Sequence, residues 1–256
     1  MRQGLGRVCL GALAGLIALW FGQAGAEPLR VAVTPWTGFA MIDVNGQLTG
    51  FNVDIMRELC KRIAVECELV MMLPGEVIEK VIAGKDVDIA AAGLLRTPDR
   101  ERRMLFTDRY WRSSSSFVAR SGTFSAPTLT ALSGRRVAAT RGSRQADYVR
   151  EHFSGVATVM EFPGFDDTLA AVAAGDADVG LLPTIAALNY LVSDAGHGME
   201  TIGDPLTEHG LGGDVAIALP LGREPLRDRL NQALRSILLD GRYDAINSRY
   251  FPFRIY

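Results

Sequence analysis

The chain has 256 residues, of which 48% are hydrophobic and 22% are charged, and its formal net charge at pH 7 is −2. This composition is typical of a globular protein and excludes a disordered chain; with three cysteines it also excludes a disulfide-dense mini-protein. The small negative charge and the lack of a long basic run give no electrostatic support to a nucleic-acid partner, so none is expected.

The first 26 residues have the features of a secretory signal peptide. Arg2 and Arg7 are followed by an apolar run at 8–21 and by a small-residue cleavage pattern that ends at Ala26. A membrane-spanning helix needs roughly 18 or more apolar residues, so this run is short for the alternative, an uncleaved anchor. We therefore predict a signal peptide over residues 1–26 and an exported mature protein.

Two cysteines remain in the mature chain, Cys60 and Cys67, with six residues between them. This spacing permits a disulfide where a helix ends and the chain reverses, and an oxidising compartment favours the bond. The alternative is a pair of buried thiols, while the spacing is wrong for a zinc knuckle. We expect a disulfide with a structural role.

Strand and helix patterns alternate along the mature chain in two blocks of about 90 residues, a size typical of small lobes. Repeated strand–helix units predict mostly parallel sheets flanked by helices. The expected strands are 29–34, 67–72 and 87–92 in the first block, 136–140, 156–162 and 177–182 in the second, and 214–220; the expected helices are 52–63, 75–83, 143–152, 166–174, 224–240 and 242–250.

The Ser- and Gly-rich segment 110–127 lies between the blocks and is typical of a crossover. We predict an α/β protein with two lobes joined by crossing strands near 116–119 and 215–218. Lobe 1 is expected to comprise residues 27–118 plus 215–256, and lobe 2 residues 119–214.

The sequence contains no phosphate-binding loop, no dinucleotide-binding glycine motif and no nucleophile elbow. The three histidines, His152, His197 and His209, are scattered without metal-ligand spacing, which is typical of surface or packing positions. We therefore predict no catalytic residue, no metal and no cofactor.

The segment around Arg100 breaks a local rule of helix formation. Thr97 is a good N-cap, Pro98 suits the first helical position and Asp99 favours the positive helix end. Arg100 opposes the helix dipole, and such violations often occur at functional sites. Its guanidinium beside a helix start would hold a carboxylate. The alternative, which stays open at this point, is that Arg100 simply pairs with Asp99 or Glu101.

A second candidate anion site lies in the other block. Gly142 and Ser143 form a turn between an expected strand and helix, where backbone donors would face an anion. Ser143 is otherwise an ordinary N-cap. Arg144 either adds a positive charge to this site or faces solvent.

Taken together, motifs along nearly the whole mature chain resemble the family 3 bacterial solute-binding proteins, the periplasmic receptors of polar amino-acid ABC transporters. Each motif is weak alone, but the order and spacing of the set are specific. The motifs lie at 29–33, 45–55, 83–90, 97–100, 105–110, 132–137, 141–143, 174–178, 240–246 and 249–251.

The resemblance implies a two-lobe periplasmic-binding-protein fold (type II) and hinge closure on a small anionic or zwitterionic ligand. It further implies a periplasmic monomer that delivers its ligand to an ABC permease. Some members of the family carry a matching Cys-x6-Cys disulfide, which supports the Cys60–Cys67 pairing. Two alternatives on the same fold are a stand-alone periplasmic sensor or accessory protein and a secreted enzyme resembling cyclohexadienyl dehydratase.

The resemblance also assigns roles to individual residues. The arginine at the position of Arg100 holds the ligand carboxylate in the family, and an aromatic residue at the position of Trp36 stacks on the ligand side chain. Trp36 read from the sequence alone could equally pack in the core. The full set of expected ligand-binding residues is Trp36, Gly93, Leu95, Arg100, Ser143 and Arg144.

Three positions depart from the family pattern. Pro183 stands where amino-acid binders usually have an aspartate for the α-ammonium group, and a proline offers neither charge nor N–H. Leu95 replaces a serine or threonine, and Gly75 stands at the place of a second aromatic wall. Either the ligand has no α-amino group or another acid substitutes, the candidates being Asp166, Asp167 and Glu208.

Overall fold

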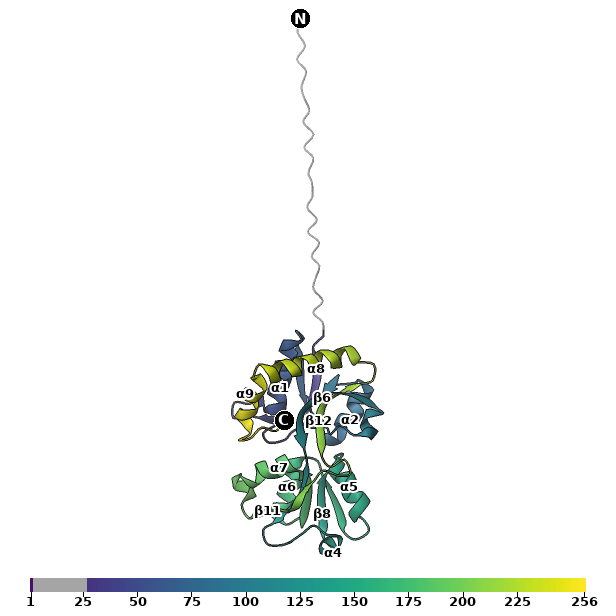
Figure 1. The fold of residues 1–256 in the computed structure, drawn as a ribbon, viewed down its shortest axis with the longest axis vertical. Coiled ribbons are helices and arrows are strands. Elements are labelled where there is room, and N and C mark those ends of the chain that lie inside the picture. Colours follow the sequence, from purple (N-terminus) through teal and green to yellow (C-terminus); the bar gives the residue numbers. More distant parts are fainter. Residues whose placement is uncertain (2–26) are drawn as a thin grey trace.

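The computed structural model describes Met1 and residues 27–256, so the predicted signal peptide, apart from Met1, lies outside the described residues. The described chain forms two α/β lobes, drawn one above the other in Figure 1. The expected two-lobe architecture is therefore confirmed. The upper lobe, lobe 1, contains the strand that follows Glu27 and also the C-terminal helices.

Lobe 1 is built on a five-stranded sheet in the order β4-β1-β5-β12-β6. Strand β1 is parallel to both of its neighbours, and β12 is antiparallel to both of its neighbours. Its elements are β1 (Leu29–Val33), β2 (Met41–Ile42), β3 (Leu48–Thr49), α1 (Phe51–Arg62), β4 (Cys67–Met71), α2 (Pro74–Ala83), β5 (Ile89–Ala90), α3 (Pro98–Glu101), β6 (Met104–Ser113), β12 (Gly213–Pro220), α8 (Glu224–Leu239) and α9 (Arg242–Tyr250).

Lobe 2 repeats this plan with a five-stranded sheet in the order β11-β7-β10-β8-β9. Here β8 is parallel to its two neighbours, and β7 is antiparallel to its two neighbours. Its elements are β7 (Ser115–Arg120), α4 (Leu129–Leu132), β8 (Arg136–Thr140), α5 (Arg144–Phe153), β9 (Thr158–Phe162), α6 (Phe165–Ala174), β10 (Val179–Pro183), α7 (Thr184–Leu191), the 3-10 helix η1 (Asp194–Gly196) and β11 (Met199–Leu206).

The chain passes between the lobes twice, at Ser114 between β6 and β7 and at 207–212 between β11 and β12. The expected boundaries lie a few residues away from these passages, because residue 118 is inside β7 and residue 215 is inside β12. The segments 116–119 and 215–218, expected as crossing strands, are thus paired within the two sheets.

An equivalent Arg–Asp ion pair lies at the start of a central parallel strand in each sheet. In lobe 1, the backbone N–H of Arg30 donates to Asp88 at 2.8 Å and its side chain pairs with the same carboxylate. In lobe 2, the backbone N–H of Arg136 donates to Asp178 at 2.8 Å, and its Nη2 lies 2.7 Å from the other carboxylate oxygen. Each pair joins the first residues of a central parallel strand to the loop before its neighbour.

The predicted disulfide is confirmed. Cys60 near the end of α1 is bonded to Cys67 at the start of β4, with the Cα atoms 6.1 Å apart. The bond therefore ties the first helix of lobe 1 to an edge strand, and no described residue of the cleft between the lobes takes part in it.

The lobes are in contact, and one hydrophobic cluster contains buried residues of both. Across the cleft, the rings of Trp36 in lobe 1 and Phe165 in α6 have centroids 4.7 Å apart. Nearby, the Thr37 hydroxyl donates a hydrogen bond of 2.8 Å to Asp166. The structure is therefore a closed arrangement held by apolar and polar contacts.

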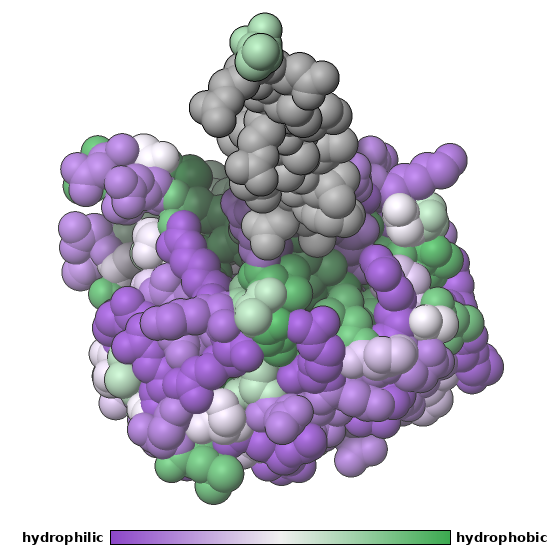
Figure 2. Space-filling view, turned by 90° about the horizontal axis from the view of Figure 1, so that it is seen from above, coloured by the Kyte–Doolittle hydropathy of each residue, from purple (hydrophilic) through white to green (hydrophobic). Residues whose placement is uncertain are grey.

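The end of lobe 1 that is remote from lobe 2 is largely hydrophilic, with apolar atoms gathered near its centre (Figure 2). A surface groove of about 750 Å³ at this end is lined by residues that include Arg30, Asp88 and Arg223. Asp88 already pairs with both arginines, so the charges of this groove compensate one another. Within the described part of the chain, no helix combines the length and the apolar character that crossing a membrane requires.

Candidate functional site

Arg100 is positioned by the short helix α3, which begins as the sequence predicts. Thr97 is its N-cap, and the Thr97 hydroxyl accepts a hydrogen bond of 3.4 Å from the backbone N–H of Arg100. Pro98 occupies the first turn, where its missing N–H costs nothing. This cap and the fixed proline angle direct the side chain of Arg100 toward the junction of the lobes.

The guanidinium of Arg100 has no carboxylate partner among the described residues. Its Nη1 donates one hydrogen bond of 2.9 Å to the carbonyl oxygen of Leu95. Pairing with Asp99 or Glu101, the alternative that the sequence left open, is not observed, because Asp99 pairs with Arg102 and Glu101 pairs with Arg96.

Burial, and after it the nearby Arg144 cation, lower the pKa of Arg100 to about 10. The group therefore remains a cation at neutral pH while its charge is poorly solvated. A buried cation without a counter-ion is unfavourable, and an anion placed beside it would be bound strongly.

Arg100 lines a small cavity between the lobes, with a volume of about 30 Å³. Lobe 1 contributes the end of β1, the start of α2 and the segment before α3; lobe 2 contributes the first turn of α5, the start of α6 and the end of β10. The lining residues are Thr34, Pro74, Val77, Ala92, Gly93, Leu94, Leu95, Arg100, Ser113, Gly142, Ser143, Arg144, Gln145, Phe165 and Pro183.

Ser143 and Arg144 hold the lobe 2 wall of this cavity in place. The Ser143 hydroxyl accepts a hydrogen bond of 3.1 Å from Ala146 and donates one of 2.6 Å to Thr140, so Ser143 is the N-cap of α5. Arg144 pairs with Asp147 at 3.1 Å. The N-terminal turn of α5, with its partial positive charge, thus faces the cavity.

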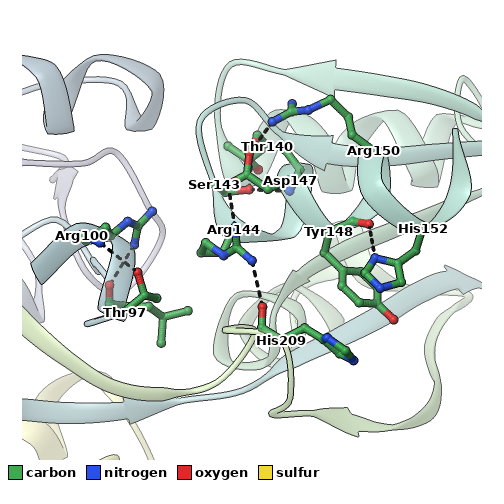
Figure 3. A network of polar contacts seen from close by, with 12 residues as sticks. Thr97, Arg100, Thr140, Ser143, Arg144, Asp147, Tyr148, Arg150, His152 and His209 are labelled. Carbon is green, nitrogen blue, oxygen red and sulfur yellow. Dashed lines mark hydrogen bonds and ion pairs between the residues drawn. The ribbon is translucent and has the colours of Figure 1, made fainter. Parts of the chain in front are cut away.

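Arg144 also connects the cavity to the second passage between the lobes. Its Nη2 donates a hydrogen bond of 2.9 Å to the carbonyl oxygen of His209, shown in Figure 3. His209 lies in the 207–212 segment, where its backbone has a positive φ of 56°. The side chains of Tyr148, His152 and His209 pack together beyond Arg144 on lobe 2, and no group of three or more metal-binding side chains occurs in the described chain.

Trp36 occupies a different place from the other expected site residues. Its side chain is 2% exposed and packs against Phe39, Trp111 and Phe165, at centroid distances of 4.0, 5.7 and 4.7 Å. It does not line the cavity, although its ring supports the wall from behind, 3.0 Å from where a Cβ on Gly93 would stand. The five other expected residues, Gly93, Leu95, Arg100, Ser143 and Arg144, line one cavity together.

Three acids were candidates to replace the aspartate that the family has at the position of Pro183, namely Asp166, Asp167 and Glu208. None of them lines the cavity. Pro183 does, as the last residue of β10. Asp166 instead accepts the hydrogen bond from Thr37, while Asp167 lies beside Gly164 and Glu208 is exposed.

One polar group of the site escaped sequence reasoning. Thr34 follows β1 directly, is 1% exposed and has a hydroxyl without a hydrogen-bond partner among the described residues. Its position at the carboxyl end of a parallel strand is the signal that was available, because ligands of α/β sheets bind at that edge.

Comparison with known proteins places this geometry in a family. The histidine-binding periplasmic protein of Salmonella typhimurium is 28% identical over 236 residues, and the lysine/arginine/ornithine-binding periplasmic protein of Escherichia coli is 29% identical over 234; each alignment covers 90% of both chains. A solved ancestral arginine-binding protein bound to arginine has a TM-score of 0.81 at 26% identity, covering 89% of this chain and 99% of that chain. A profile of one family matches residues 29–253, so the chain belongs to the bacterial extracellular solute-binding proteins, family 3, as its motifs predict.

Proposed function

We propose that the protein is a periplasmic receptor that captures a small carboxylate-bearing solute between its lobes and delivers it to an ABC permease. The observation that carries this proposal is the guanidinium of Arg100, which faces the cavity between the lobes without a carboxylate partner among the described residues. The relatives named above are binding proteins for amino acids, which are themselves carboxylates.

Capture proceeds by closure of the two lobes on the ligand. The carboxylate docks on lobe 1 through Arg100, and lobe 2 then brings in the first turn of α5 beside Ser143. The two passages, at Ser114 and 207–212, are the hinge. Closure excludes water and thereby strengthens the charge-assisted hydrogen bonds, and it creates a surface that a permease can distinguish from the open form.

Trp36 has a supporting role in this proposal. In the closed arrangement its ring packs behind Gly93 and against Phe165, so it favours closure. Stacking of Trp36 on a ligand side chain, the role that the resemblance implies, stays a prediction and requires the lobes to be apart.

We further propose that the protein binds its ligand without converting it and acts as a monomer. The cavity groups that can contact an anion are guanidinium, hydroxyl and amide groups. These groups bind a negative charge by donating hydrogen bonds, and they do not transfer a proton to or from the ligand at neutral pH. A turnover assay with prephenate and arogenate separates this proposal from a dehydratase activity: either substrate being consumed would contradict it.

A stand-alone sensor or accessory protein is the second candidate, and the small size of the cavity favours it. Phe165 and Trp36 pack against each other at the junction, and the cavity that Arg100 and Pro183 line has a volume of only about 30 Å³. In that case the closed form would persist with or without a small molecule.

Both candidates are tested by a thermal-shift screen of small carboxylates followed by small-angle X-ray scattering of the free protein. A receptor is stabilised by its ligand through mass action, and its radius of gyration falls when the ligand is added. A protein that responds to no carboxylate and keeps one radius throughout would contradict the receptor proposal and support the accessory role.

A further inference from the structure

We propose that the ligand is a short 2-hydroxy or 2-oxo monocarboxylate, an anion without an α-ammonium group; this inference rests on the proposed receptor function. It follows from the charge, the unpartnered hydroxyl and the size of the cavity beside Arg100.

Of the two arginines that line the cavity, Arg100 is the one without a carboxylate partner among the described residues. Arg144 is paired with Asp147 at 3.1 Å, and Asp147 also pairs with Arg150, whose second partner is Glu161. Arg100 has only the carbonyl oxygen of Leu95. A monocarboxylate would therefore supply the counter-ion that Arg100 lacks, whereas a zwitterion would also bring a cation into a cavity that two arginines and no acid line. An enclosed charge without a partner is strongly unfavourable.

The lobe 2 wall of the cavity contributes no carboxylate that could pair with an ammonium group. Pro183 and Phe165 line it, and neither side chain can accept a hydrogen bond. Asp166, an acid close to this wall in sequence, is engaged with Thr37 in the contact between the lobes.

The unpartnered hydroxyl of Thr34 indicates a second ligand oxygen. This side chain is 1% exposed, lines the cavity and lacks a hydrogen-bond partner among the described residues. A hydroxyl can donate to a carbonyl oxygen or exchange hydrogen bonds with another hydroxyl. A hydroxy or oxo group next to the carboxylate would satisfy Thr34 while the carboxylate neutralises Arg100.

The closed lobes limit the length of the ligand. The cavity of about 30 Å³ is small, and the neighbouring space of about 190 Å³ that Arg100 also lines extends toward Thr97 and Asp147. The backbones of Gly75 and Gly142 meet across the junction so closely that a Cβ on Gly142 would lie 2.5 Å from the Cα of Gly75. A long side chain on the ligand would hold these backbones apart.

Isothermal titration calorimetry with matched pairs tests the inference on the unmodified protein. The pairs are glycolate with glycine and L-lactate with L-alanine, and L-arginine, L-histidine, phosphate and sulfate are titrated beside them. We expect the hydroxy acid of at least one pair to bind tenfold or more tightly than its amino partner. Equal or tighter binding of amino acids would overturn the inference and leave the receptor proposal standing. Binding of phosphate or sulfate alone, or of nothing, would overturn both.

A substitution at position 183 provides an independent test. Pro183 is the N-cap of α7, a position where Asp and Asn are both favourable, so Pro183→Asp and Pro183→Asn are expected to fold alike. Only the first adds a carboxylate to the cavity. We expect Pro183→Asp to weaken lactate binding at least tenfold relative to Pro183→Asn and to move the preference toward alanine. The same preference in both variants would overturn the inference.

Discussion

Gly142 of lobe 2 lies against Gly75 of lobe 1, with their backbones in direct contact across the cleft. Gly142 has a φ of 74°, a left-handed conformation that glycine adopts without strain. The contact therefore depends on the missing side chain of Gly142, whereas a Cβ on Gly75 would meet only Arg141, at an ordinary distance of 3.7 Å.

Replacement of Gly142 by alanine is expected to open the lobes, because the new Cβ would lie 2.5 Å from the Gly75 Cα. Small-angle X-ray scattering in the presence of the carboxylate with the largest thermal shift should show a larger radius of gyration for this variant than for the unmodified protein. Gly134→Ala is the matched control, since Gly134 has a φ of 71° and a Cβ there would meet no atom within 4 Å. An unchanged radius in Gly142→Ala, or an equal change in the control, would contradict a closure role for this contact.

The hydrogen bond from Thr37 to Asp166 is expected to stabilise the closed form by about 0.5 to 1.5 kcal/mol, the usual net value of such a bond. Thr37→Val removes the hydroxyl but keeps the shape, so it should weaken binding of the carboxylate with the largest thermal shift by about two- to tenfold. Calorimetry checks this expectation, with Thr37→Ser as the variant that keeps the donor. Equal affinity of the valine and serine variants would show that the bond does not contribute to closure.

The Arg136–Asp178 pair should make the stability of lobe 2 depend on pH. The hydrogen bond from Arg136 lowers the pKa of Asp178 below its usual range, since its effect exceeds the opposing effect of partial burial. A lowered folded-state pKa gives stability that is present above the unfolded pKa of about 4 and is lost as the pH falls through the folded value.

Asp178→Asn is therefore expected to lower the melting temperature at pH 7, and the difference from the unmodified protein should shrink as the pH falls through the folded-state pKa of Asp178. Asp204→Asn is the control, because this exposed carboxylate makes no hydrogen bond or ion pair within the described structure. Melting curves from pH 7 downward measure the difference. A deficit that persists unchanged at the lowest pH would mean that packing, and not charge, is what the substitution removes.

Local patterns predicted the parts of the molecule that depend on neighbouring residues. The caps at Thr97 and Ser143, the Cys60–Cys67 disulfide and the strand at 136–140 all follow from residues within one or two turns of each other. These features are set by short-range hydrogen bonds and covalent geometry, so the sequence carries them directly.

The burial of the serine run at the start of lobe 2 does not follow from neighbouring residues. Its polarity is typical of a linker, yet Ser115 and Ser116 are buried in β7. The Ser115 hydroxyl donates to the carbonyl oxygen of Leu211 at 2.6 Å, and Ser116 bonds with Thr184 at 2.8 Å. These partners are distant in the sequence, so the strand expected near 116–119 was predicted without the contacts that bury its first two serines.

The residues of the candidate site also differ in whether neighbouring residues in the sequence reveal their role. Arg100 was proposed as a site residue because it violates a helix rule within its own turn, whereas the burial of Trp36 depends on Phe165 in the other lobe. The Arg–Asp pair shared by the two lobes also escaped sequence reasoning, because its partners are 58 residues apart in lobe 1 and 42 in lobe 2.

The most direct test of a ligand-binding Arg100 compares Arg100→Met with the unmodified protein in thermal unfolding, with and without the best carboxylate from the screen. Methionine removes a buried uncompensated charge, so the free variant should melt at the same or a higher temperature. Its ligand-induced shift should disappear, because losing the partner of a buried carboxylate weakens binding by roughly 2 to 5 kcal/mol. Arg96→Met, which removes an exposed arginine paired with Glu101, should retain the shift. An undiminished shift in Arg100→Met would contradict the account.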